Sequence, residues 1–130
     1  METQTTHFGL TQIGQIAINA KDIDRAVAFY RDTLGMRFLF QAPPKLAFFE
    51  CGGVRLMLGV AEREEFDHPG SIVYYKVDNL PEAHQTLLAR GVRFEHEPTL
   101  VARMPDHELW MAFFRDSEGN LLGVMSEVRS

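Results

Sequence analysis

The sequence has one cysteine among its 130 residues, Cys51, so a disulfide within the chain is impossible. Basic residues are also few, since 13 Lys and Arg stand against 18 Asp and Glu and give a formal net charge of −5. Without a basic stripe the chain has little to hold a phosphate backbone, which excludes nucleic acid as a partner. No apolar run approaches the roughly 20 residues that span a bilayer, and the first residues do not resemble a signal peptide. We therefore expect a cytoplasmic protein with no membrane association.

Several chemical motifs are also missing from the sequence. It contains no Gly-rich phosphate loop, no nucleophile elbow and no Cys-x-x-Cys pair. Its five histidines form no His-x-His or His-x₃-His pair. Phosphoryl transfer, serine hydrolysis and dithiol redox chemistry therefore have no support, and Cys51 is interpreted as a structural thiol near a turn.

An internal repeat is the main feature that the chain does contain. Three landmarks recur at a constant spacing of 56 residues, and these are Gly14 and Gly70, Asp22 and Asp78, and Gly35 and Gly91. Such self-similarity indicates two copies of one structural unit. Because the whole chain has the length of one ordinary domain, we expect both copies to form a single domain over residues 1–130.

Within each copy the hydrophobic period changes in the same order. Residues 13–20 alternate as in a strand, whereas 22–34 place apolar side chains on one helical face, with Asp22 as N-cap and Gly35 as the stop. In the second copy Asn79 or Asp78 caps a helix that ends before Gly91. Three strand candidates follow each helix, at 36–41, 46–51 and 54–59, and at 92–96, 109–115 and 121–126. The sequence thus predicts an α+β fold of two βαβββ modules, at about 10–60 and about 70–127, joined by a linker at about 60–69.

Two motifs carry a resemblance to a known family. The stretch from Asp22 to Gly35 includes a Phe29-Tyr30 pair, and Asp116-Ser117-Glu118-Gly119-Asn120 precedes the last strand. Together with the duplication, they resemble the vicinal oxygen chelate superfamily, which includes glyoxalase I, bleomycin-resistance proteins and extradiol dioxygenases. The resemblance covers roughly residues 10–127. It implies a curved, cup-shaped mixed sheet with helices on the outside, a small-molecule site in the cup, and a homodimer.

The resemblance also locates the positions of the family's metal ligands. Enzymatic members hold a divalent metal with one His, Gln or Glu from the first and the fourth strand of each module. The corresponding positions here are Gln15, Met57, Gly123 and either Ser71 or Ile72. Only Gln15 is an acceptable donor, and hard cations need several oxygen or imidazole ligands. We therefore expect neither a metal nor another cofactor.

Six residues are candidates for contact with a ligand in the cup, namely Gln15, Arg55, Met57, Tyr74, His107 and Trp110. Gln15 and Met57 are expected to face the cavity, with Arg55 beside Met57 as an anion contact. Tyr74 and Trp110 either line the cavity or belong to the core, because strand parity is not known without the register. His107 belongs to a polar loop that is either a lid or a solvated turn.

Two functions remain open from the sequence. The first is a metal-independent binding protein that holds a partly apolar or aromatic compound in the cup, as bleomycin-resistance proteins do. The alternative is a glyoxalase- or dioxygenase-like enzyme, a lyase, isomerase or oxygenase. Such an enzyme would use an atypical metal set, or cofactor-free acid–base chemistry by His107 and Tyr74.

Overall fold

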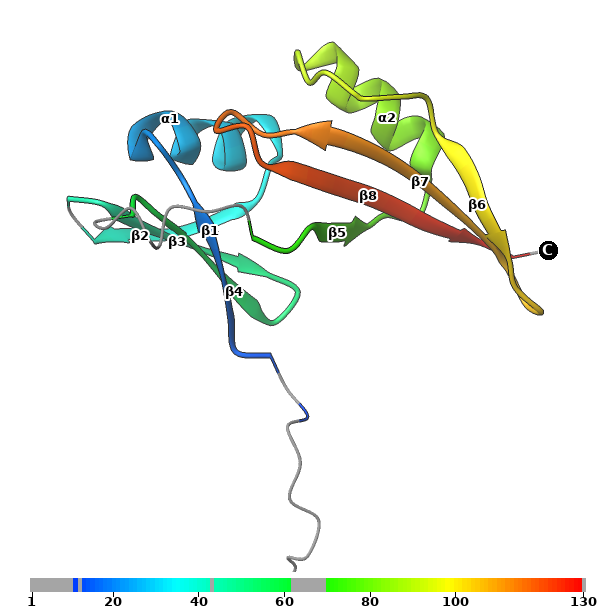
Figure 1. The fold of residues 1–130 in the computed structure, drawn as a ribbon, viewed down its shortest axis with the longest axis horizontal. Helices are drawn as coiled ribbons and strands as arrows, with labels where there is room; N and C mark the ends of the chain where they lie inside the picture. Colours follow the sequence, from blue (N-terminus) through cyan, green and yellow to red (C-terminus); the bar gives the residue numbers. More distant parts are fainter. Residues whose placement is uncertain (1–10, 12, 43, 62–69, 130) are drawn as a thin grey trace, which may run out of the picture.

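The structure is a computed structural model that describes residues 11, 13–42, 44–61 and 70–129. Figure 1 shows two twisted sheets side by side, with helix α1 over one sheet and helix α2 over the other, both on the same side. This arrangement confirms an α+β fold of two βαβββ modules. Neither helix among the described residues is long and apolar enough to cross a membrane.

Module one contains four strands and one helical segment. Its elements are β1 (Gln15–Asn19), α1 (Ile23–Ala28), the π-helical turn η1 (Phe29–Thr33), β2 (Arg37–Ala42), β3 (Leu46–Cys51) and β4 (Val54–Gly59). The strands form a sheet in the order β1-β4-β3-β2. Strand β1 runs parallel to β4, and the other neighbours are antiparallel.

Module two repeats this topology. Its elements are β5 (Val73–Lys76), α2 (Leu80–Ala89), β6 (Thr99–Arg103), β7 (Glu108–Arg115) and β8 (Leu121–Val128), with the sheet order β5-β8-β7-β6. Among the described residues no backbone ladder joins the two sheets. The expected curved sheet therefore consists of two separate four-stranded sheets. Of the expected linker, residues 62–69 lie outside the described part of the chain.

The helix boundaries follow the predicted capping residues. The Asp22 carboxylate accepts a hydrogen bond from the Arg25 backbone N–H at 3.1 Å, and Asn79, rather than Asp78, caps α2 through the Glu82 N–H at 3.0 Å. Gly35 and Gly91 end the helical segments with φ of +72° and +88°, a conformation in which a Cβ would be strained. The predicted helix over 22–34 is α-helical only as far as Ala28 and continues as a π turn.

The predicted strand at 92–96 is wrong. The strand that follows α2 is β6, which begins at Thr99, and Phe94 makes only an isolated bridge to Phe114. Between them the chain bends, and the Thr99 hydroxyl donates a hydrogen bond to the Glu97 carbonyl at 2.8 Å. Pro98 has no N–H to contribute to a ladder, so pairing resumes only after it.

The hydrophobic core lies between the helices and the sheets and includes residues of both modules. The most deeply buried large side chains include Tyr30, Phe49 and Leu58 from module one and Leu80, Phe114 and Leu122 from module two. One hydrogen bond crosses the boundary inside this core, from the Tyr30 hydroxyl to the Asp116 carboxylate at 2.7 Å. The two modules are therefore packed against each other through their helix-covered sides.

Candidate functional site

Each sheet has one face covered by a helix and one face without a helix, which we call the open face. Leu56 and Leu58 of β4 are buried on the helix-covered side, as are Leu122 and Val124 of β8. Side chains alternate along a strand, so the residues between these pairs point to the open face. The open face of module one thus includes Gln15, Arg55, Met57, Phe40 and Phe48, and that of module two includes Tyr74, Phe113 and Gly123.

On module one the structure brings Gln15 and Met57 together. The Gln15 amide nitrogen donates to the Met57 sulfur at 3.6 Å, a weak hydrogen bond because a thioether is a poor acceptor. The Arg55 guanidinium lies 5.9 Å from the centre of the Phe48 ring. Phe48 in turn stacks on Phe40 with ring centres 4.7 Å apart. This part of the open face is therefore an aromatic surface with one amide and one cation.

On module two an aromatic ring covers the fourth-strand position of the family's metal site. Tyr74 pairs with Gly123 across β5 and β8. A Cβ added at Gly123 would lie 2.8 Å from the Tyr74 ring and 3.2 Å from the Phe113 ring. These two rings contact each other edge to face, with centres 5.7 Å apart. The space that a ligand side chain at position 123 would need is occupied by tyrosine.

The strand register also aligns the two modules with each other. Met57 pairs with Ala17, and Gly123 pairs with Tyr74, so Ala17 and Tyr74 are equivalent positions. Two residues earlier, Gln15 therefore corresponds to Ile72, which is the second of the two counterparts left open by the sequence, rather than to Ser71. The four positions then offer an amide, a thioether, a hydrocarbon and a hydrogen atom.

This donor set does not fit the divalent metal of the family's enzymes. Such a metal needs several oxygen or imidazole donors that converge, and only the Gln15 amide provides one. Elsewhere in the described part of the chain, no group of three or more His, Cys, Asp or Glu side chains is arranged to hold a metal ion.

The structure does not bring His107 and Tyr74 together. His107 lies at the turn between β6 and β7, where its Nδ1 is 2.7 Å from the Asp106 carboxylate. Hydrogen bonds from Arg129 and His107 lower the pKa of Asp106 to about 2. Within the described ranges, no hydrogen bond or ring contact joins His107 to Tyr74. The geometry therefore favours the interpretation of this polar loop as a turn held by charged side chains.

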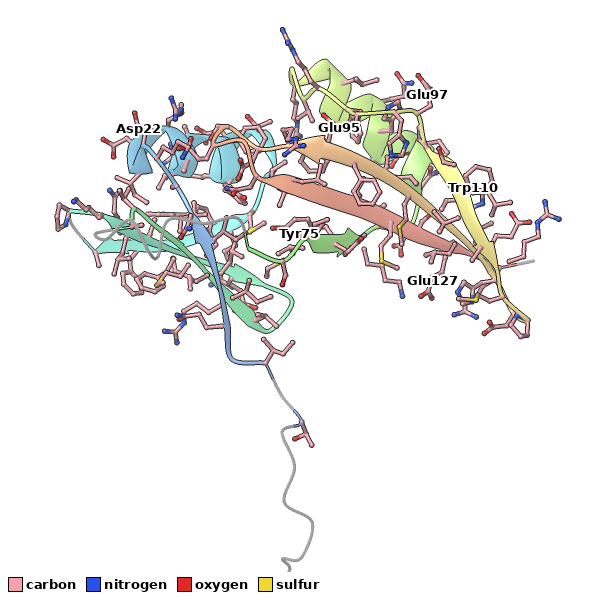
Figure 2. All side chains as sticks on the ribbon, viewed as in Figure 1. Asp22, Tyr75, Glu95, Glu97, Trp110 and Glu127 are labelled. Atoms are coloured by element: carbon pink, nitrogen blue, oxygen red, sulfur yellow. The ribbon has the colours of Figure 1, made fainter. Side chains whose placement is uncertain are left out.

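Trp110 lies on the helix-covered side of module two. It precedes the buried Ala112 and Phe114 by two and four residues, and it packs against the core. Its indole N–H donates to the Glu108 carboxylate at 3.1 Å. Figure 2 shows Trp110 near β6 and β7, at the end of module two that is far from β1. Tyr74 and Trp110 thus occupy opposite faces of the same sheet.

Two contacts on the open face were not anticipated from the sequence. Phe113 contacts the Tyr74 ring, and Phe48 lies between Arg55 and Phe40. Both are flanked by buried neighbours, and an alternating count along the strands places them on the same face as Met57 and Gly123. The alternation along a strand predicts these contacts only when its partner strands are known, because a single strand does not show which of its faces is covered.

Comparisons with known sequences and structures identify the class of proteins to which these paired βαβββ modules belong. The sequence model of the Glyoxalase/Bleomycin resistance protein/Dioxygenase superfamily matches residues 12–124, and the chain belongs to this family. A glyoxylase-like domain-containing protein of Didymella fabae is 32% identical over 118 residues, which cover 84% of this chain and 88% of that protein.

Solved structures agree with this assignment. Lactoylglutathione lyase from Agrobacterium tumefaciens superimposes with a TM-score of 0.69 at 25% identity, covering 90% of this chain and 94% of the other. An antibiotic-binding protein of a Streptomyces species, TnmS3, superimposes with a TM-score of 0.70 at 21% identity, covering 93% and 99% of the two chains. The second similarity shows the fold alone.

Proposed function

We propose that this protein binds a partly apolar or aromatic small molecule on its open face and does so without a metal ion. The observation that carries the proposal is the Tyr74 ring over Gly123, at a position where enzymatic relatives have a ligand side chain. An aromatic ring in that place removes a donor and adds apolar surface. Ligand sites of this kind are mostly apolar, with a few polar groups that orient the ligand.

The residues of the open face suit such a ligand. Phe40, Phe48, Phe113 and Tyr74 offer ring faces or edges for stacking. The Gln15 amide supplies a donor and an acceptor, and the Arg55 guanidinium adds a positive charge. The antibiotic-binding function of TnmS3, which shares this fold, supports binding as the role of the open face.

The alternative is an enzyme of the glyoxalase or dioxygenase type, a lyase, isomerase or oxygenase. One observation favours it, namely the similarity to a lactoylglutathione lyase over nine-tenths of the chain. Against it stand the four positions Gln15, Met57, Ile72 and Gly123, which cannot reproduce a metal centre.

We also propose that the protein acts in the cytoplasm as a homodimer, consistent with its single cysteine and its exposed apolar strand residues.

Elemental analysis of protein purified without chelator tests the metal-free part of the proposal. We expect far less than one Ni, Zn, Mn or Fe per chain, also after incubation with each metal and gel filtration. One tightly held ion per chain that is lost on Gln15→Ala would contradict it.

Binding is tested with the aromatic dye 1-anilinonaphthalene-8-sulfonate, whose fluorescence rises in apolar surroundings. Tyr74→Ala should weaken dye binding several-fold, because it removes the ring that covers Gly123 on the open face of module two. Leu88→Ala is the matched control, since Leu88 is similarly exposed but lies on α2. Equal affinities of the Tyr74 variant and the wild type would contradict binding at this face.

A further inference from the structure

A cavity of about 350 Å³ lies between the modules on their helix-covered side, away from the open face. Its walls come from the residues just after η1, the end of β3, strand β5, helix α2 and the buried sides of β7 and β8. Most of the wall is apolar and includes Leu34, Met36, Val77, Leu87, Phe114 and Val124. This volume is within the range of small-molecule sites in proteins.

The Tyr75 hydroxyl is a buried, unpaired polar group beside this cavity. Tyr75 lines the cavity, and its phenol oxygen is buried without a hydrogen-bond partner among the described residues. In Figure 2 Tyr75 lies beside β5, between the two sheets. Its neighbour Tyr74 points to the open face, so the two tyrosines serve different surfaces. A buried hydroxyl without a partner costs about 1–3 kcal/mol, a cost that a ligand oxygen could remove.

A cation, the Arg90 guanidinium, belongs to a second polar residue that lines the cavity. Arg90 caps α2 and donates through Nη1 to the Thr33 carbonyl at 3.0 Å, which connects the two modules across the cavity. The Arg90 side chain makes no ion pair with any acidic residue in the described ranges, and a guanidinium has further N–H donors. A charged donor of this kind recognises a carboxylate.

We infer that this cavity is a second ligand site and that it takes a monocarboxylic acid with an apolar body. The carboxylate binds Arg90 and the hydrocarbon or aromatic body fills the apolar walls. On entering, the ligand reaches the closed-off Tyr75 hydroxyl, and one of its oxygens accepts a hydrogen bond from this group. Binding is non-covalent, because burial, together with the charge of Glu50, raises the pKa of the Cys51 thiol and lowers its thiolate fraction.

The probe for the test is 4-phenylbutanoate, with 4-phenylbutan-1-ol as its neutral analogue, titrated calorimetrically into the full chain. Arg90→Gln should weaken binding of the acid about five-fold and leave the alcohol unchanged, since it removes one exposed ion pair. Tyr75→Phe should weaken the acid by a similar factor through loss of one hydrogen bond. Because it deletes a single buried oxygen, this variant also keeps the fold.

A blocking variant separates the cavity from the open face. Thr86 lines the cavity but is exposed on α2, so Thr86→Trp should close the cavity without disturbing the core and abolish binding. Gln85→Trp, at an exposed helix position outside the cavity, is the matched control and should bind as the wild type does.

The only cysteine of the chain provides a second readout, because Cys51 lines the same cavity. Acid at ten times its dissociation constant should slow alkylation of Cys51 by iodoacetamide about ten-fold, by mass action. Thr86→Trp should lose this protection. Absence of binding, or binding that protects Cys51 from alkylation in no case and is unchanged in Arg90→Gln, Tyr75→Phe and Thr86→Trp, would overturn the second site. The comparison of Tyr74→Ala with wild type is made with the dye also in the Thr86→Trp background, where the cavity is closed, so failure here leaves the proposed function of the open face standing.

Discussion

The Glu118 carboxylate is buried and surrounded by hydrogen-bond donors. Its side chain is 1% exposed and pairs with Arg25 at 2.8 Å. It also accepts from the backbone N–H groups of Lys21 and Asp22 at 2.7 and 2.8 Å, and from the Ser117 hydroxyl. Burial opposes its ionisation, but the hydrogen bonds from Arg25, Asp22, Ser117 and Lys21 prevail and lower its pKa to about 2. This residue of module two therefore anchors the start of α1 in module one.

The lowered pKa of Glu118 predicts how stability depends on pH. A carboxyl group with a depressed folded-state pKa stabilises the protein above its ordinary pKa near 4.5, and this contribution is lost as the pH falls toward 2. The shift corresponds to about 3 kcal/mol. We expect Glu118→Gln to lower the free energy of unfolding at pH 7 by about 2–4 kcal/mol and to flatten its decline between pH 5 and 3. Urea unfolding at several pH values measures both effects.

The control for this prediction is Glu97→Gln, since the Glu97 carboxylate is exposed and makes no hydrogen bond or ion pair with a described residue. It should leave the pH profile unchanged. A Glu118→Gln profile that parallels the wild type from pH 7 to 3 would show that Glu118 does not have a depressed pKa.

Single residues were predictable from sequence where a motif fixed their neighbours. The family resemblance placed the first-strand position on Gln15, just after Gly14, and the match of Leu56-Met57-Leu58 with Leu122-Gly123-Val124 located the fourth-strand positions. Trp110 was not predictable in the same way, because its face depends on the register of β7 against β8. The role of Tyr75 could not be predicted either, since the cavity beside it forms only when both modules pack.

At the scale of elements, strand β4 gives a direct test of the register. Leu56 is 3% exposed within the core, whereas the adjacent Met57 points to the open face. We expect Leu56→Ala to cost roughly 2–5 kcal/mol as a core truncation. Met57→Glu should leave the melting temperature nearly unchanged, because its carboxylate remains in contact with solvent. Thermal unfolding followed by circular dichroism compares the two.

The opposite result would require a shift of one residue in β4. If Met57→Glu unfolds the domain while Leu56→Ala melts as the wild type does, every side chain of the strand faces the other way. The equivalence of Met57 and Gly123 to metal-ligand positions would then fail as well.

Most elements were predictable because each has a local cause. Asp22 and Asn79 cap helices, Gly35 and Gly91 end them, and β3 and β4 keep the predicted boundaries at 46–51 and 54–59. The exception is the strand predicted at 92–96. The constant spacing of the landmarks ends at Gly91, and module two then inserts a bend before β6. The repeat shows where units begin but not where a loop has lengthened.

At the scale of the whole molecule, the two modules form one core, with the Asp116 to Asn120 turn of module two against α1 and β1. Asn120 donates to the Asn19 carbonyl at 2.8 Å, and Tyr30 donates to Asp116 at 2.7 Å. Asn19 is the last residue of β1, and Asp116 and Asn120 belong to the turn after β7, so side-chain bonds hold this turn to both β1 and the helical segment of module one. The helix-covered sides are thus used for contacts within the chain, and the open faces remain available for other contacts.

The exposed apolar residues of the strands predict the state of the molecule in solution. Leu39 of β2 is 39% exposed and Val101 of β6 is 54% exposed, and both strands lie at an edge of their sheet. A two-fold partner would bury such residues together with unpaired sheet edges, so we expect a homodimer of about twice 14.8 kDa. Light scattering across micromolar concentrations measures this mass. Val101→Glu should shift the mass toward the monomer, whereas Leu88→Glu, on α2 and 41% exposed, should not. A wild-type mass of 14.8 kDa at every concentration would rule out the dimer.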